Sequence, residues 1–156
     1  MTRALLLSVR PRFAQGLLAG TKTVEVRRRF PNIPEDTTVV LYSSSPDKAI
    51  LGTVRTRRLV RSDAAEIWRN YSDAIDLSYR ELADYLAGAS ECTVLEVDTP
   101  DLWPRAVTLA ELRRHLRIEP AQSFRYVTAT ELNRLRRLAE RAGKAPLTWA
   151  EEQQPR

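Results

Sequence analysis

The sequence has little of the material that disulfides, metal clusters or membrane spans require. It contains one cysteine, Cys92, and one histidine, His115. A lone cysteine excludes an internal disulfide, and so few thiols and imidazoles do not favour a zinc site. The longest apolar runs, ALLLSV and TTVVLY, are strand-sized, whereas a membrane-spanning helix needs about 20 apolar residues. We therefore expect a cytoplasmic protein with no membrane partner, no metal and no cofactor.

The whole chain carries a formal net charge of +5, and its positive charge is concentrated in the first part of the sequence. Residues 1–61 hold 12 basic and 4 acidic side chains, whereas residues 62–156 hold 13 basic and 16 acidic ones. Such asymmetry is typical of a protein that contacts a polyanion. Two ordinary explanations remain open: solvated charged faces, and a genomic base composition that favours arginine, which supplies 22 of the 25 basic residues.

The order of local signals predicts an α+β fold, because strands cluster early and helices follow. Pro11 and Gly20 mark the two ends of a first helix. Four pairs have capping-box spacing and predict later helices: Asp63 with Glu66, Ser78 with Glu81, Thr108 with Glu111, and Thr128 with Glu131. The expected strands are residues 4–9, 23–29, 37–42, 49–60, 92–97 and 123–128.

No linker or repeat divides the chain. We therefore expect one domain over residues 1–143 and a polar tail over residues 144–156. Gly52 and the SSSP turn that begins at Ser43 offer bend points at which a curved sheet could close into a small barrel.

The segment GTKTVEVRRRF, residues 20–30, carries the most informative pattern. In a strand, Glu25 and Arg27 share one face at a spacing of about 7 Å, while the two valines beside them face the core. Lys22 falls at the turn that precedes the strand. An amine, a carboxylate and a guanidinium could therefore converge on one cleft. Arg28 falls on the valine side, which suggests that the strand bends or ends there.

These three groups permit two kinds of chemistry. A desolvated Lys22 could act as a general base, with Glu25 relaying protons and Arg27 holding an anion. The same groups could instead bind a phosphate and a base edge without reaction. The ordinary alternative is a solvated strand face whose ion pairs contribute roughly 0–1 kcal/mol each.

Two further stretches could contact nucleic acid. In YSSSPDK, residues 42–48, an aromatic ring could stack on a base, while serine hydroxyls and a lysine bind an anion. In RTRRLVR, residues 55–61, arginines on one strand face could follow a phosphate backbone. A polar hairpin turn and a solvated face are the respective alternatives.

Taken together, these segments resemble the ASCH domain family of the PUA-like superfamily. The match lies in G-x-K-T-x-E-x-R at residues 20–27 and in Y-x-S-S-P at residues 42–46, within a resemblance that spans residues 4–61. The resemblance implies a small, mixed and mostly antiparallel β-barrel surrounded by helices. It also implies a cleft lined by Lys22, Glu25 and Arg27, with Ser44 and Ser45 near its rim.

PUA-like domains commonly bind RNA, and some small ASCH proteins are enzymes. One subgroup resembles amidohydrolases that remove an acetyl group from acetylated cytidine, and another comprises ribonucleases. The amidohydrolase lysine matches Lys22. The catalytic threonine of that subgroup falls at Glu25, so this chain departs from its pattern. Family membership alone fixes no reaction.

We therefore expect first an RNA-binding or single-strand-binding module, as a monomer or weak dimer, and second a hydrolase in which Lys22 and Glu25 are catalytic. A third hypothesis, a protein-interaction surface on an arginine-rich helix over residues 131–142, has no specific motif behind it. An enclosed cavity of roughly 300 Å³ or more would favour chemistry, and an open basic groove would favour binding. The candidate binding residues are Arg10, Lys22, Glu25, Arg27, Arg28, Arg29, Tyr42, Ser44, Ser45, Lys48, Arg55 and Arg57.

Overall fold

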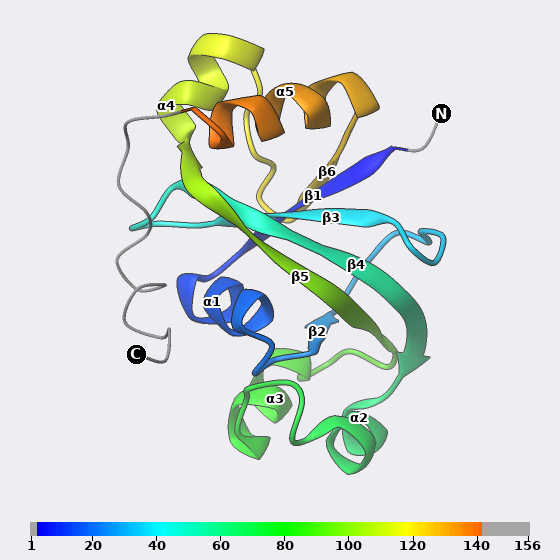
Figure 1. Cartoon of the computed structure of the whole chain (residues 1–156). Helices are drawn as coiled ribbons and strands as arrows, with labels where there is room; N and C mark the ends of the chain where they lie inside the picture. The colour runs from blue at the N-terminus through cyan, green and yellow to red at the C-terminus, as the bar shows by residue number, and fades with distance from the viewer. Residues whose placement is uncertain (1–2, 142–156) are drawn as a thin grey trace.

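A curled six-stranded sheet forms the centre of the protein, seen in a computed structural model that describes residues 3–141 (Figure 1). The order across the sheet is β2-β5-β4-β3-β1-β6. Only β1 and β3 run parallel, and every other neighbouring pair is antiparallel. The expected α+β, mostly antiparallel, barrel-like fold is therefore confirmed. The strands are β1 (Ala4–Val9), β2 (Val24–Arg27), β3 (Thr38–Ser43), β4 (Ala49–Ser62), β5 (Cys92–Thr108) and β6 (Phe124–Val127).

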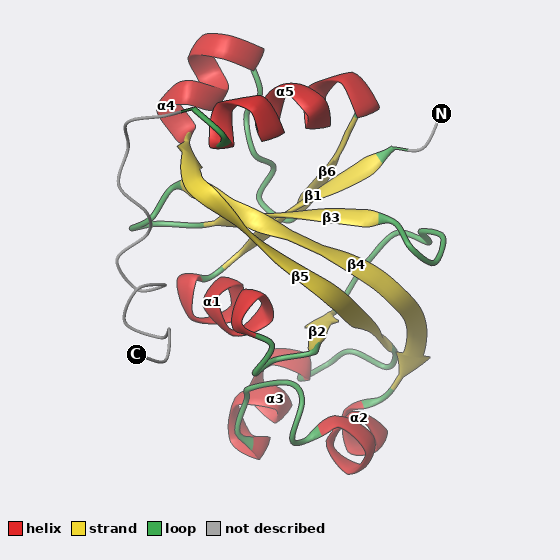
Figure 2. Ribbon diagram, in the orientation of Figure 1, coloured by secondary structure: helices red, strands yellow, loops and turns green. Residues whose placement is uncertain are grey.

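Helices flank this sheet on separate sides, with α1 on one side and α4 and α5 at the opposite end from α2 and α3 (Figure 2). The capping boxes expected at Ser78, Thr108 and Thr128 form, while Asp63 accepts only the backbone N–H of Glu66. No helix among the described residues is long and apolar enough to cross a membrane. The helices are α1 (Pro11–Ala19), α2 (Ala64–Tyr71), α3 (Tyr79–Leu86), α4 (Leu109–Glu111), η1 (Leu112–Leu116) and α5 (Ala129–Ala139). The tail predicted over residues 144–156 lies outside the described residues.

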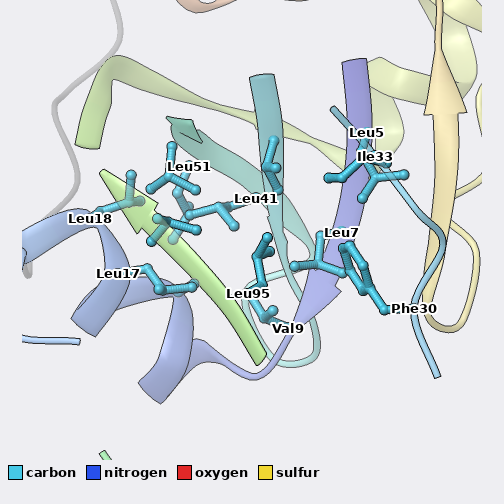
Figure 3. Packing of buried hydrophobic residues seen from close by; sticks show 14 of the residues in the cluster. Leu5, Leu7, Val9, Leu17, Leu18, Phe30, Ile33, Leu41, Leu51 and Leu95 are labelled. Atoms are coloured by element: carbon cyan, nitrogen blue, oxygen red, sulfur yellow. The ribbon is translucent and has the colours of Figure 1, made fainter. Parts of the chain in front are cut away.

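The apolar side chains form three clusters, and β1 contributes to two of them because successive side chains point to opposite faces. Leu5 and Leu7 pack with Leu17 of α1 (Figure 3), whereas Leu6 packs with Leu135 of α5 on the other face. A third cluster joins the valines of β2 to α2 and α3. Each group of helices is therefore fixed to the sheet by its own core.

The strand β5 is longer than the sequence predicts, since the expected strand covered only residues 92–97. Pro100 and Pro104 interrupt the apolar pattern beyond that point. Beyond Val97 the described pairing of β5 is with β4 alone, because β2 pairs only with Thr93–Glu96. A proline on a strand with one free edge loses no ladder hydrogen bond, so the strand continues through both prolines.

Gly52 is the bend point at which β4 and β5 approach most closely. A Cβ atom built at this position would lie 2.2 Å from the backbone oxygen of Asp101 and 2.9 Å from Cδ2 of Leu18. The β4–β5 register shifts between Ile50 and Gly52. Only a residue without a side chain allows β4 and β5 to approach this closely while Leu18 of α1 packs against the same point.

We expect Gly52→Ala to destabilise the protein by about 2–4 kcal/mol, because the new methyl group overlaps backbone and cannot be relieved by a side-chain rotation. The measurement is the free energy of unfolding in urea. Gly20→Ala is the comparison, since Gly20 has φ +81° but nothing within 4 Å of its added Cβ. Its cost should be only about 1–2 kcal/mol. Equal losses in the two variants would contradict steric exclusion at Gly52.

Candidate functional site

A cavity of about 610 Å³ opens between the end of β1, the strand β2 and the helices α1 and α3. The turn after β3 and the loop before β6 complete its wall. Segments that are far apart in the sequence therefore meet here. The lining residues are Ser8, Val9, Arg10, Phe13, Lys22, Glu25, Val26, Arg27, Ser44, Leu77, Glu81, Asp84, Tyr85 and Gln122.

Glu25 stands between two cations on one side of this cavity. Its Oε1 lies 3.5 Å from Nζ of Lys22, and its Oε2 accepts a hydrogen bond of 3.0 Å from Nε of Arg27. The residue is 6% exposed, so the pair of contacts compensates a carboxylate that has little access to water. The strand parity predicts that Glu25 and Arg27 share a face, and the structure places them together there.

Lys22 lines the cavity as expected, but its side chain is buried, which its predicted position at the turn before the strand did not indicate. The side chain is 1% exposed, and its Nζ donates to the backbone oxygen of Ile75 and lies 4.6 Å from the centre of the Phe13 ring. The segment between α2 and α3 covers the amine, which a local pattern could not foretell. Burial lowers the pKa of Lys22, and the nearby charge of Glu25 opposes that shift in part.

Arg27 connects two strands that are not neighbours in the sheet. Its NH2 group donates a hydrogen bond of 2.6 Å to the backbone oxygen of Ser8 in β1, while its Nε holds Glu25 on β2. A guanidinium has five N–H donors in a fixed plane, so it can serve both partners at once. This side chain thus bridges the curled sheet at the point where the cavity forms.

The helix α3 supplies the wall that the sequence did not reveal. Arg12 on α1 holds it by contacts of 3.2 Å to Asp76 and 2.9 Å to Glu81. The backbone N–H of Ser78 and then Arg12 lower the pKa of Glu81 to about 2, so this carboxylate stays ionised. Tyr85 is 41% exposed and lines the cavity with Asp84. The Ser78–Glu81 spacing predicted the cap, but no local signal placed α3 here.

Seven of the twelve candidate binding residues are not among those that line the cavity. Tyr42 is buried in the apolar cluster that contains Leu6 and Leu135. Side chains of β3 alternate between the two faces of the sheet, so Val39 and Leu41 pack on the α1 side instead. Burial also raises the pKa of Tyr42. Ser45 and Lys48 are exposed in the turn after β3. Of the residues in this turn, only Ser44 lines the cavity.

The remaining four are arginines that lie elsewhere. Arg28 follows the end of β2 and donates to the backbone oxygens of Tyr85 and Ala87, so it anchors the end of α3. Arg29 is exposed beyond the strand. Arg55 and Arg57 are exposed on β4, where Arg55 lies 3.4 Å from Asp36. The basic strand face is therefore separate from the cavity.

The described part of the chain contains no group of three or more His, Cys, Asp or Glu side chains arranged to hold a metal ion. The chemically versatile groups of the cavity are therefore the buried amine, the carboxylates, the guanidinium groups and the serine hydroxyls.

The lowered pKa of Lys22 predicts a specific pH dependence of stability. Between the folded-state pKa and the ordinary value near 10.5, the unfolded chain binds more protons, so the free energy of unfolding rises with pH. Below the folded-state pKa both states are protonated and the slope vanishes. Wild type should therefore gain stability relative to Lys22→Met as the pH rises toward 10.5, as measured by urea unfolding at a series of pH values. Lys48→Met, at an exposed lysine, is the control. A constant difference between wild type and Lys22→Met would contradict the assignment.

Comparisons with known proteins agree with this architecture. A family model described as a domain of unknown function (DUF365) matches residues 3–135. An ASCH domain-containing ribonuclease of Zymomonas mobilis is 28% identical over 131 residues, which cover 83% of this chain and 87% of the relative. The crystal structure of ASCH from Zymomonas mobilis has a TM-score of 0.82 at 26% identity, over 86% of this chain and 94% of that one. An Agrobacterium tumefaciens protein, with a TM-score of 0.58 at 15% identity, covers 93% of this chain and 98% of its own, and shows likeness of fold alone. The chain belongs to the ASCH domain family.

Proposed function

We propose that this protein binds RNA and that one nucleotide of the strand enters the cavity beside Lys22, Glu25 and Arg27. The observation that carries the proposal is the cavity, whose volume of about 610 Å³ can hold a nucleoside and, by the criterion given above, also favours the second, chemical candidate described below. The ribonuclease name of the Zymomonas mobilis relative supports RNA as the class of ligand.

The charges of the cavity suggest how a strand would be held. Its lining contains three basic side chains, Arg10, Lys22 and Arg27, and three acidic ones, Glu25, Glu81 and Asp84. A balanced lining suits a nucleoside better than a row of phosphates. The phosphates would then stay at the rim of the cavity, beside the exposed side chain of Arg10. We place this activity in the cytoplasm, with the protein as a monomer or weak dimer.

Arg10 is the rim residue from which the clearest binding effect is expected. It is exposed at the start of α1, and within the described chain its side chain has no acidic partner. Arg10→Ala should weaken binding of a 20-nucleotide RNA about three- to tenfold and reduce the slope of log affinity against log salt by about 1. Fluorescence anisotropy at several salt concentrations measures both quantities.

The control is Arg69→Ala, which removes an exposed arginine on α2 that is not among the lining residues. Its affinity and salt slope should match those of wild type. If wild type fails to bind RNA at low salt, or if the two variants lose affinity equally, the proposed binding mode is wrong.

A second candidate function, RNA hydrolysis, is favoured by one observation: an amine with a lowered pKa beside the cavity. A neutral Lys22 could take the proton of a 2′-hydroxyl while that oxygen attacks the adjacent phosphorus. The bond from phosphorus to the 5′-oxygen breaks, and the leaving oxygen receives a proton from the lysine. The products are a 2′,3′-cyclic phosphate and a 5′-hydroxyl. Arg27 has further N–H donors with which to hold the phosphate oxygens.

Lys22→Met and Lys22→Arg should both lower the cleavage rate at least about a hundredfold, because neither side chain can take a proton at neutral pH. Gel analysis of a labelled RNA measures the rate, and the same RNA with one 2′-deoxy nucleotide at the cleaved position should resist. Urea unfolding must show that the variants are folded. Full activity in a folded Lys22→Met protein would exclude this mechanism. If wild type binds RNA but does not cleave it, only the binding function would remain.

A further inference from the structure

Two charged side chains of the cavity lining differ from the others because they have no partner within the described residues. Lys22, Glu25 and Arg27 contact one another, and Glu81 is held by Arg12. For the carboxylate of Asp84 and the guanidinium of Arg10, no hydrogen bond or ion pair is found in that part of the chain. These two groups, of opposite sign, are therefore the ones available to a ligand.

They come from different walls of the cavity. Arg10 lies between the end of β1 and the start of α1, whereas Asp84 and the half-exposed Tyr85 are consecutive residues of α3 that both line the cavity. An aromatic ring next to a cavity offers a face on which any base can stack. A carboxylate that lines the same cavity can then receive hydrogen bonds from the edge of that base.

The chemistry of the carboxylate limits which base this would be. An ionised aspartate only accepts hydrogen bonds, and its two oxygens can take two parallel N–H groups. Guanine has two neighbouring donors on its Watson–Crick edge, the ring N1–H and the exocyclic amino group. Cytosine and adenine have an amino donor beside an acceptor, and uracil has one N–H between two carbonyl oxygens. Only guanine therefore fits both carboxylate oxygens without repulsion.

We propose that Asp84 makes the cavity selective for guanine, with Tyr85 stacking on the base and Arg10 contacting a flanking phosphate. This proposal rests on the proposed RNA binding and adds the identity of the preferred nucleotide. It also assigns a role to α3, whose acidic residues Glu81 and Asp84 otherwise work against the approach of an anionic strand.

The test uses the full chain and RNAs of about eight nucleotides, a length suited to one small binding domain. The RNAs are a uridine octamer and the same octamer with a single central guanosine, adenosine or cytidine. Wild type should bind the guanosine octamer about tenfold more tightly than the uridine octamer, as one good bidentate contact predicts. Asp84→Asn replaces one acceptor oxygen with a donor amide, so the preference should fall to about twofold or less. Fluorescence anisotropy measures the affinities.

The matched control is Asp73→Asn, which removes the same charge from an exposed aspartate outside the lining. It should keep the guanosine preference. Equal affinity of wild type for all four octamers, or an unchanged preference in a folded Asp84→Asn protein, would overturn the selectivity while RNA binding stands. Failure of wild type to bind any octamer or the 20-nucleotide RNA would overturn RNA binding itself.

Discussion

The contact on which the site depends is the buried carboxylate of Glu25 between Lys22 and Arg27. Each partner is fixed elsewhere as well, Lys22 to the backbone at Ile75 and Arg27 to the backbone at Ser8. One charge cluster thus joins β2, β1 and the segment before α3. Removing Glu25 would leave the buried amine of Lys22 without its counter-charge, a loss of typically about 3–5 kcal/mol. The same cluster therefore forms one side of the cavity.

This arrangement creates a tension between stability and chemistry. Burial depresses the proton affinity of Lys22, whereas Glu25 restores it in part. A useful base needs the first effect, and a stable fold benefits from the second. The hydrogen bond from Arg27 spreads the charge of Glu25 over two cations, which weakens its hold on the lysine. The triad can therefore be both the structural centre of the cavity and its chemical centre.

Local patterns located the motif but only part of the site. The alternation of residues 23–29 correctly paired Glu25 with Arg27, and the strand end at Arg27 separated Arg28 from them. In β3, in contrast, the alternation of side chains places Tyr42 in the apolar cluster beneath α5, away from the cavity. Arg55 and Arg57 share a strand face as the pattern predicts, but that face lies away from the cavity. The spacing of residues in the sequence predicts which side chains share one face of a strand or helix. It does not predict which other part of the protein, or solvent, that face contacts.

The sequence by itself determined the class of fold, the elements around the motif and the family, because periodicity, caps and turn residues act over a few positions along the chain. Only the tertiary structure decided that Lys22 is buried, that α3 walls the cavity, and that Asp84 and Tyr85 reach it. Those facts follow from contacts between residues 50 to 60 positions apart, such as Lys22 with Ile75 and Arg28 with Tyr85. Long-range packing sets the solvent access of each charge, and solvent access decides whether a lysine remains a surface cation or becomes a base.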